Sequence, residues 1–190
     1  MVDSVLPRGF EANKYVSGKQ RFGEGLALVD NQLIQITWQE NTALVYDQET
    51  FEQTGSFEYD TEGWGICYDG ESLYMSDGSS TLTWLDPTTF RTMKTLFVRD
   101  ENGPVMYLNE LEYIDGYIYA NQWQAPYIFK IDPGSGNIIG KIDVTNIWNR
   151  VKAKDPQADV PNGIAYDTSS KKIFITGKKW PELYEIELGK

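Results

Sequence analysis

The sequence of 190 residues contains no histidine and a single cysteine, Cys67. Zinc sites built from His and Cys side chains therefore cannot be assembled, and an internal disulfide is excluded. Basic residues are also scarce, because 17 Lys and Arg stand against 28 Asp and Glu and give a net charge of -11. Such a chain repels nucleic acids and anionic membranes, so we expect neither as a partner.

Long apolar runs are missing as well. No stretch reaches the length of a transmembrane helix, and residues 1–20 lack the apolar core of a signal peptide. The sequence as written predicts a soluble protein and leaves its compartment open. Aromatic residues make up 14% of the chain and hydrophobic residues 41%, which is enough for one core and favours strands over helices.

Four segments share one plan, in which a short apolar strand, a polar turn and a second alternating strand follow one another. They are "EGLALVDNQLIQITW", "WGICYDGESLYMSD", "NELEYIDGYIYANQW" and "NGIAYDTSSKKIFITGK". After the first three, a third and a fourth strand follow around an acidic turn residue, which is Asp47, Asp86 or Asp132. Four strands repeating every ~40–45 residues are typical of the blades of a β-propeller.

A β-sandwich also has many short strands, but it does not require a repeat in register, so the pattern favours the propeller. Only the stretch Thr145–Gln157 has helical periodicity, with Ile147, Trp148 and Val151 on its apolar side. It is predicted to be an insertion between blades. The predicted fold class is all-β, a propeller with four recognisable blades.

The ends of these hairpins carry the chemistry. First-strand starts and second-strand ends lie on the same side of each hairpin, so in a propeller they meet at one mouth of the central channel. The residues concerned are Glu24, Trp64, Asn109, Glu110 and Asn162 at the starts, and Trp38, Asp77, Trp123 and Lys178 at the ends. Because the repeats share their apolar pattern and differ here, we expect a scaffold that holds an asymmetric site.

Eight short motifs occur in order at these hairpin ends. They are "FGEGL", "ITW", "GWG", "SDG", "LNELEY", "NQW", "NGIAYD" and "TGKKWPELYEI". This ordered set, which runs from Phe22 nearly to the C-terminus, resembles the plant and bacterial type of glutaminyl cyclase, the glutamine cyclotransferase family.

The resemblance implies a five-bladed propeller that acts as a glutaminyl-peptide cyclotransferase. Such an acyltransferase converts the N-terminal glutamine of a peptide or protein to pyroglutamate and releases ammonia, and we expect it to need no metal or other cofactor. A secreted or periplasmic location follows from the resemblance alone. By matching motifs, the site residues are Phe22, Glu24, Trp38, Trp64, Asn109, Trp123 and Lys178.

The chain departs from the family at its start, because the Phe-x-Gln-Gly motif of the family's first blade does not occur. Residues 1–21 are interpreted as an N-terminal segment whose "KYVSGKQ" is a candidate tail of that blade, and residues 22–190 as the propeller blades. An open ring exposes sheet edges, so we expect a second copy or a missing segment to complete it. The alternatives are a fragment, an engineered self-assembling propeller, or an incomplete one that only binds peptide N-termini.

The chemistry assigns a role to each site residue. Cyclisation joins the α-amine of glutamine to its own carboxamide, so the enzyme holds a curled conformer and moves protons. Glu24, flanked by glycines, is the candidate that takes the amine proton and passes it to the leaving ammonia. Lys178 and Asn109 are candidate donors to the oxyanion or to the ground-state amide. The indoles of Trp38, Trp64 and Trp123 are candidates for a wall that raises the pKa of Glu24, and these three residues and Phe22 are the candidates for binding the substrate.

Each assignment has a structural alternative. Spacing alone makes Glu24 a solvated or capping residue, Asn109 a turn residue, and Lys178 a surface lysine beside Lys179. Indoles in strands are more often core than pocket. The resemblance favours the site over these alternatives.

Overall fold

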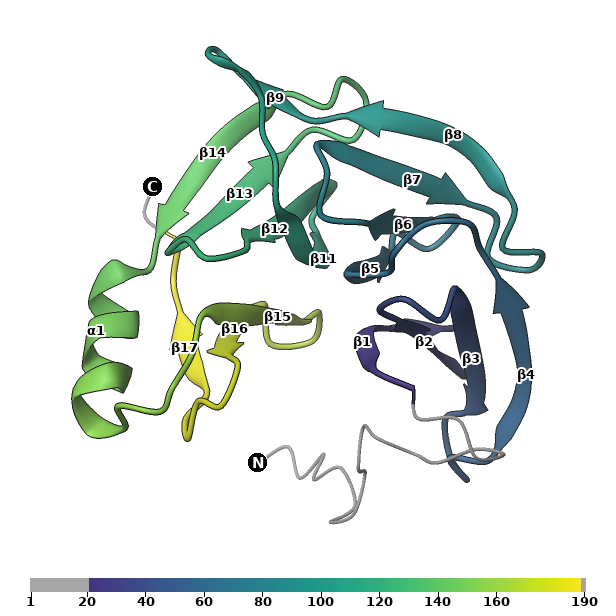
Figure 1. Cartoon of the computed structure of the whole chain (residues 1–190), viewed down its shortest axis with the longest axis horizontal. Helices are drawn as coiled ribbons and strands as arrows, with labels where there is room; N and C mark the ends of the chain where they lie inside the picture. The colour runs from purple at the N-terminus through teal and green to yellow at the C-terminus, as the bar shows by residue number, and fades with distance from the viewer. Residues whose placement is uncertain (1–20, 189–190) are drawn as a thin grey trace.

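The computed structural model describes residues 21–188. These residues form three antiparallel sheets of four strands, one sheet of three strands and one small hairpin. Within each larger sheet the strands lie side by side in sequence order (Figure 1). Each sheet is therefore a meander, which is the pattern of a propeller blade.

The first sheet contains β1 (Gly23–Val29), β2 (Gln32–Thr37), β3 (Thr42–Asp47) and β4 (Gln53–Glu58). The second contains β5 (Gly65–Tyr68), β6 (Leu73–Ser76), β7 (Thr81–Leu85) and β8 (Thr92–Phe97). The hairpin of β9 (Arg99–Asp100) and β10 (Gly103–Pro104) follows. The third contains β11 (Leu108–Ile114), β12 (Tyr117–Gln122), β13 (Tyr127–Ile131) and β14 (Ile138–Asp143). The last contains β15 (Pro161–Asp167), β16 (Lys172–Gly177) and β17 (Tyr184–Ile186).

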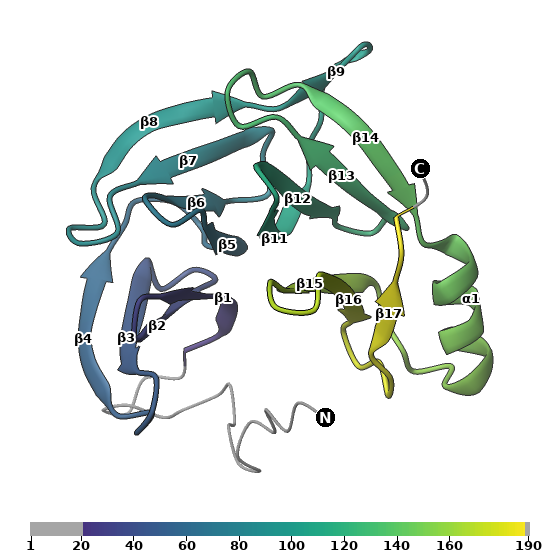
Figure 2. The same cartoon turned by 180° about the vertical axis from the view of Figure 1, so that it is seen from behind.

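The four sheets are arranged as successive blades of an arc. Strands β1, β5, β11 and β15 lie innermost, and β4, β8, β14 and β17 lie outermost (Figures 1 and 2). Each innermost strand packs against the next one along the chain. The prediction of an all-β propeller with four blades is confirmed, while the fifth blade stays a prediction. The proposed first-blade remnant in residues 1–20 lies outside the described residues.

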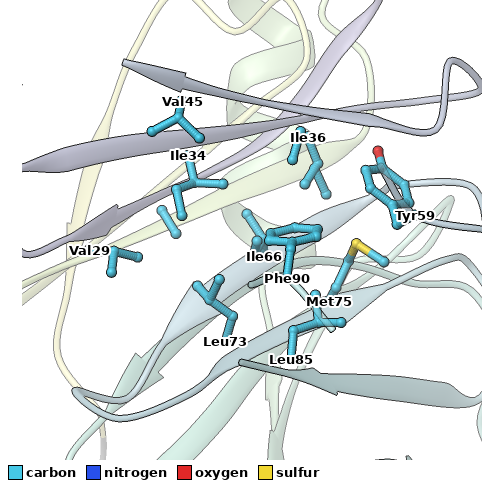
Figure 3. Close-up of a cluster of buried hydrophobic side chains, with 12 residues drawn as sticks. Val29, Ile34, Ile36, Val45, Tyr59, Ile66, Leu73, Met75, Leu85 and Phe90 are labelled. Atoms are coloured by element: carbon cyan, nitrogen blue, oxygen red, sulfur yellow. The ribbon is translucent and has the colours of Figure 1, made fainter. Parts of the chain in front are cut away.

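Alternating side chains form the core between neighbouring blades. In β1, Ala27 and Val29 are buried, whereas Leu26 and Leu28 on the other side of the strand are exposed. The buried pair packs with Ile66 of β5 in the cluster between the first two sheets (Figure 3). Two further clusters join the second sheet to the third and the third to the fourth. Because each cluster spans two blades, the blades hold one another in place.

The acidic turn residues that mark the repeat have a local role. Each carboxylate accepts hydrogen bonds from the residues two and three positions further along the chain. These bonds lower the pKa of each side chain, most strongly through the backbone N–H of Thr50 and Thr89 and the hydroxyl of Ser135. Examples are Asp47 with Thr50 at 2.8 Å, Asp86 with Thr89 at 2.7 Å and Asp132 with Gly134 at 3.0 Å. They define the turns between the third and fourth strands.

The predicted helical insertion is present as α1 (Thr145–Lys154), between β14 and β15. It ends three residues before the predicted boundary, since Pro156 disfavours helical backbone at the residue before it. Val151 is buried, and Ile147 packs against the cluster between the third and fourth sheets. Within residues 21–188, no helix combines the length and apolar character needed to cross a bilayer.

Candidate active site

The open end of each first hairpin continues by one backbone hydrogen bond beyond the strands. The residue after the second strand donates its N–H to the residue before the first strand in three of the blades. These pairs are Trp38 to Phe22 at 2.9 Å, Trp123 to Tyr107 at 2.8 Å and Lys178 to Val160 at 3.0 Å. Hairpin ends far apart in sequence therefore present their side chains at equivalent positions, as the repeat predicts.

Irregular pairing occurs where the site residues lie. The register of the first hairpin shifts between Gly23/Leu26, Leu108/Leu111 and Pro161/Ile164 in three blades. Glu24, Asn109 and Asn162 fall inside these shifts. A bulge changes the direction of a side chain relative to regular pairing. These polar side chains therefore need not follow the regular alternation between the two faces of the strand.

A pocket of about 190 Å³ lies at this mouth, and its lining is the set predicted from the sequence. The lining residues are Phe22, Glu24, Trp38, Trp64, Asn109, Trp123 and Lys178. The structure thus brings all seven together, while the role of each stays a prediction. Of the other hairpin-end residues, Asp77 does not line the pocket; its Oδ1 accepts the N–H of Ser79 at 3.0 Å in a local turn.

Glu24 and Lys178 form an ion pair in the lining of the pocket. Lys178 Nζ lies 3.5 Å from Glu24 Oε1, so the contact links the first and last described blades. The Glu24 side chain is 14% exposed. Burial raises the pKa of Glu24, and the charge and hydrogen bond of Lys178 lower it by less. A carboxyl group in this environment is better suited to accept and donate protons near neutral pH than a solvated one.

Two aromatic pairs flank the pocket. Phe22 packs edge-on against Trp38 with ring centroids 6.1 Å apart, and Trp64 packs edge-on against Trp123 at 5.4 Å. Glu62 fixes one indole of each pair, because its Oε2 accepts the Nε1–H of both Trp38 and Trp64 at 2.9 Å. The bond from Trp64, then that from the Gln39 side chain and that from Trp38, lower the pKa of Glu62 and keep it a carboxylate.

Asn109 offers an unpaired acceptor. The residue is 3% exposed, and its Oδ1 has no hydrogen-bond partner among the described residues. Its backbone carbonyl accepts the hydroxyl of Ser76 at 2.6 Å, which holds the main chain in place. A buried carbonyl oxygen without a partner costs about 1–3 kcal/mol, and a ligand N–H in the pocket would recover that energy.

Two glycines allow the innermost strands to approach closely near the site. A Cβ at Gly25 would lie 2.7 Å from the backbone nitrogen of Ile66, and a Cβ at Gly65 would collide with the carbonyl of Asn109. No larger residue fits at either position without moving a neighbouring strand. The glycine after Glu24 is thus explained by the close packing of β1 on β5.

Side chains of the third blade hold the backbone of β15, the strand that pairs with the strand leading to Lys178. Asn121 Oδ1 accepts Gly163 N–H at 2.9 Å, and Glu110 Oε2 accepts Ile164 N–H at 2.9 Å. Glu112 Oε1 accepts Tyr166 N–H at 2.8 Å. Burial and then the neighbouring Glu112 charge raise the pKa of Glu110, and burial raises the pKa of Glu112 to about 7.

Replacing Glu112 with glutamine should stabilise the protein at pH 8 by at most about 3 kcal/mol. The pKa of Glu112 lies above its value of 4.5 in an unfolded chain, so its contribution to folding is complete below pH 4.5 and is lost as the pH rises through about 7. Glutamine keeps an acceptor for Tyr166 N–H and does not ionise. Urea unfolding from pH 4 to 9 measures the difference between the two proteins. Glu71→Gln at an exposed turn is the control, and parallel curves for Glu112→Gln and wild type would contradict the prediction.

Sequence reasoning missed two residues that belong to this region, Glu62 and Tyr107. Glu62 immediately precedes the "GWG" motif. An acidic residue beside a glycine is usually a solvated turn residue, so the sequence does not indicate that Glu62 binds two indoles. Tyr107 precedes β11 at the position that Phe22 has before β1. Alignment of the repeats could therefore have indicated Tyr107 as the equivalent of Phe22. Among residues 21–188 there is no cluster of three or more His, Cys, Asp or Glu side chains arranged to hold a metal ion.

Fold and pocket together define a β-propeller protein with a small aromatic-walled site in which one acid faces one lysine. The chain belongs to the glutamine cyclotransferase family, because the model of that family matches residues 9–188. The chain is 40% identical over 169 residues to a glutaminyl-peptide cyclotransferase of Arabidopsis thaliana. This match covers 88% of the chain and 53% of the relative, so the chain spans about half the length of that curated relative.

Comparison with solved structures agrees with this family assignment. The crystal structure of the Myxococcus xanthus glutaminyl cyclase matches with a TM-score of 0.84 and 34% identity, covering 92% of this chain and 80% of that one. The computationally designed Ika4 protein matches with a TM-score of 0.52 and 11% identity, covering 91% and 96% of the two chains. At that identity the likeness shows the fold alone.

Proposed function

We propose that this chain is a glutaminyl-peptide cyclotransferase, which converts the N-terminal glutamine of a peptide or protein to pyroglutamate and releases ammonia. The observation that carries the proposal is the contact between Glu24 and Lys178 inside the aromatic pocket. It places a carboxyl group of raised pKa beside a cation in a space of about 190 Å³. The names of the two relatives at 40% and 34% identity support the same activity.

The reaction forms a bond between the α-nitrogen and the carboxamide carbon of one glutamine residue. The α-amine has a pKa of ~8, so a usable fraction is neutral at pH 7–8 and can attack. Glu24 takes the proton that the nitrogen loses and gives it to the departing carboxamide nitrogen, which leaves as ammonia. One group thus serves as base and then as acid, and no proton is consumed overall.

Lys178 and Asn109 act on the carboxamide. The Lys178 ammonium stabilises the negative charge that develops on the carboxamide oxygen when the amine attacks. Asn109 has its unpaired Oδ1 available to accept an N–H of the amine or the carboxamide, which holds the curled conformer. The walls formed by Trp38, Trp64 and Trp123 exclude water and strengthen both contacts.

Completion of the ring is part of this proposal. The first and fourth blades are the ends of the described arc and meet at the site through Glu24 and Lys178. A second copy or a further segment that packs beside β1 would bury Leu26 and Leu28, which are 43% and 47% exposed. We infer that turnover is faster in that completed form than in the isolated chain.

The activity is tested by incubating the purified chain with a peptide that begins with glutamine and following the loss of ammonia by mass spectrometry. An N-acetylated copy of the peptide is the unreactive control, because its nitrogen cannot attack. Size-exclusion chromatography with light scattering assigns the activity to a monomer or an oligomer. We expect conversion of the free peptide only. Peptide binding without conversion in every fraction would instead support the alternative that the chain only holds peptide N-termini.

A further inference from the structure

Tyr107 has an unfavourable backbone conformation, and burial of its side chain does not account for it. Its φ is 65°, in the left-handed region that bulky residues rarely occupy. Phe90 has a similar φ of 58°, but its ring is buried in the core between the first two blades. The Tyr107 residue is instead 51% exposed. Strained residues of this kind are concentrated at sites that bind ligands.

The backbone of Tyr107 is anchored to two pocket walls. Its N–H donates to the carbonyl of Gly78 at 2.8 Å, and its carbonyl accepts the N–H of Trp123 at 2.8 Å. The Trp64 ring packs directly on Gly78, at a distance that excludes a Cβ there. The side chain of Gln122 also donates to the carbonyl of Met106 at 3.2 Å. Tyr107 is therefore held in fixed relation to the two indoles on which the pocket depends.

Tyr107 is the structural equivalent of Phe22 in another blade. Each precedes a first strand, each accepts the N–H of a tryptophan, and each ring lies 6.1 Å from that tryptophan's ring. Phe22 lines the pocket, whereas Tyr107 packs against Trp123 and does not itself line the pocket. A half-exposed aromatic ring therefore lies next to the pocket, beside Trp123.

The volume of the pocket limits what it holds. About 190 Å³ is below the ~300–1,000 Å³ of sites that enclose a drug-sized ligand, so it accommodates one residue of a peptide. If that residue is the reacting glutamine, its α-amine and carboxamide lie inside near Glu24. The next residue of the peptide must then lie on the rim.

We propose that Tyr107, packed on Trp123, forms a binding subsite for the side chain of the residue that follows the N-terminal glutamine, and that it favours aromatic and large apolar residues. The inference rests on the proposed function. A ring stacked on Tyr107 gains contact area that a glycine at the same peptide position cannot provide. Tyr107 is a specificity residue in this proposal and takes no part in proton transfer.

The test compares two peptides, Gln-Phe-Ala and Gln-Gly-Ala, on the wild type and on Tyr107→Ala, Tyr107→Phe and Phe97→Ala. Phe97 is the control, because it is 68% exposed and lies on the outermost strand β8. We expect Tyr107→Ala to lower kcat/KM for Gln-Phe-Ala by about 5- to 10-fold, mainly through KM, and to change Gln-Gly-Ala by less than about twofold. Tyr107→Phe and Phe97→Ala should behave like the wild type.

Other outcomes overturn the subsite. An equal loss with both peptides would give Tyr107 a structural role only, and no loss with either would show that the ring is not used. Turnover of Gln-Gly-Ala by the wild type tests the proposed function separately, because that peptide does not need the subsite. If the wild type turns over neither peptide, calorimetric binding of the two peptides to the wild type and to Tyr107→Ala decides the same question without catalysis.

Discussion

Replacing Glu24 with glutamine should lower the turnover of a glutamine peptide by at least ~10²-fold with the fold intact. Glutamine has nearly the same shape but cannot accept the proton of the attacking amine. Because Glu24 moves a proton only in the chemical step, the loss should fall mainly on kcat, and peptide binding should survive. Steady-state kinetics by mass spectrometry and peptide binding by calorimetry measure the two effects.

Glu58→Gln is the matched control for this experiment. Glu58 is exposed at the end of the outer strand β4, so the substitution makes the same chemical change away from the pocket. Near-UV circular dichroism and the melting temperature of all three proteins show whether the fold is retained. If the wild type is active and Glu24→Gln has the same kcat, Glu24 is not part of the mechanism.

Replacing Lys178 with methionine should lower kcat by about 10²–10³-fold, the loss seen when one oxyanion donor is removed from an enzyme. It should also change the pH dependence. The Lys178 charge lowers the pKa of Glu24, so its removal leaves the effect of burial unopposed and raises that pKa further. The acidic limb of the kcat/KM profile, which reports the base in the free enzyme, should move to higher pH.

Lys179→Met is the control for the lysine experiment. Lys179 follows Lys178 directly but is exposed and does not line the pocket. It removes the same charge from the chain, so a general effect of net charge would appear in both variants. An unshifted acidic limb in Lys178→Met would mean that the group titrating in the profile is not Glu24.

Some residues of the site could be predicted from the sequence and others could not. Trp38, Trp64 and Trp123 were predictable because they recur at the ends of aligned hairpins, where the repeat places equivalent positions together. Glu62 was not predictable, because its two indole partners come from different hairpins and meet only when the first two blades pack. Glu112 carries no sequence signal for its raised pKa, since that depends on what surrounds it.

The sequence by itself determined the period of the repeat, the alternation of buried and exposed positions and the identity of the residues at the hairpin ends. These are properties of short segments, because the geometry of strands and turns depends on neighbours a few residues away. Only the tertiary structure decided that Glu24 of the first described blade meets Lys178 of the last, that burial outweighs this lysine in setting the pKa of Glu24, and that Tyr107 lies against Trp123. Desolvation and the attraction between charges depend on distances across the folded chain, which no local pattern contains.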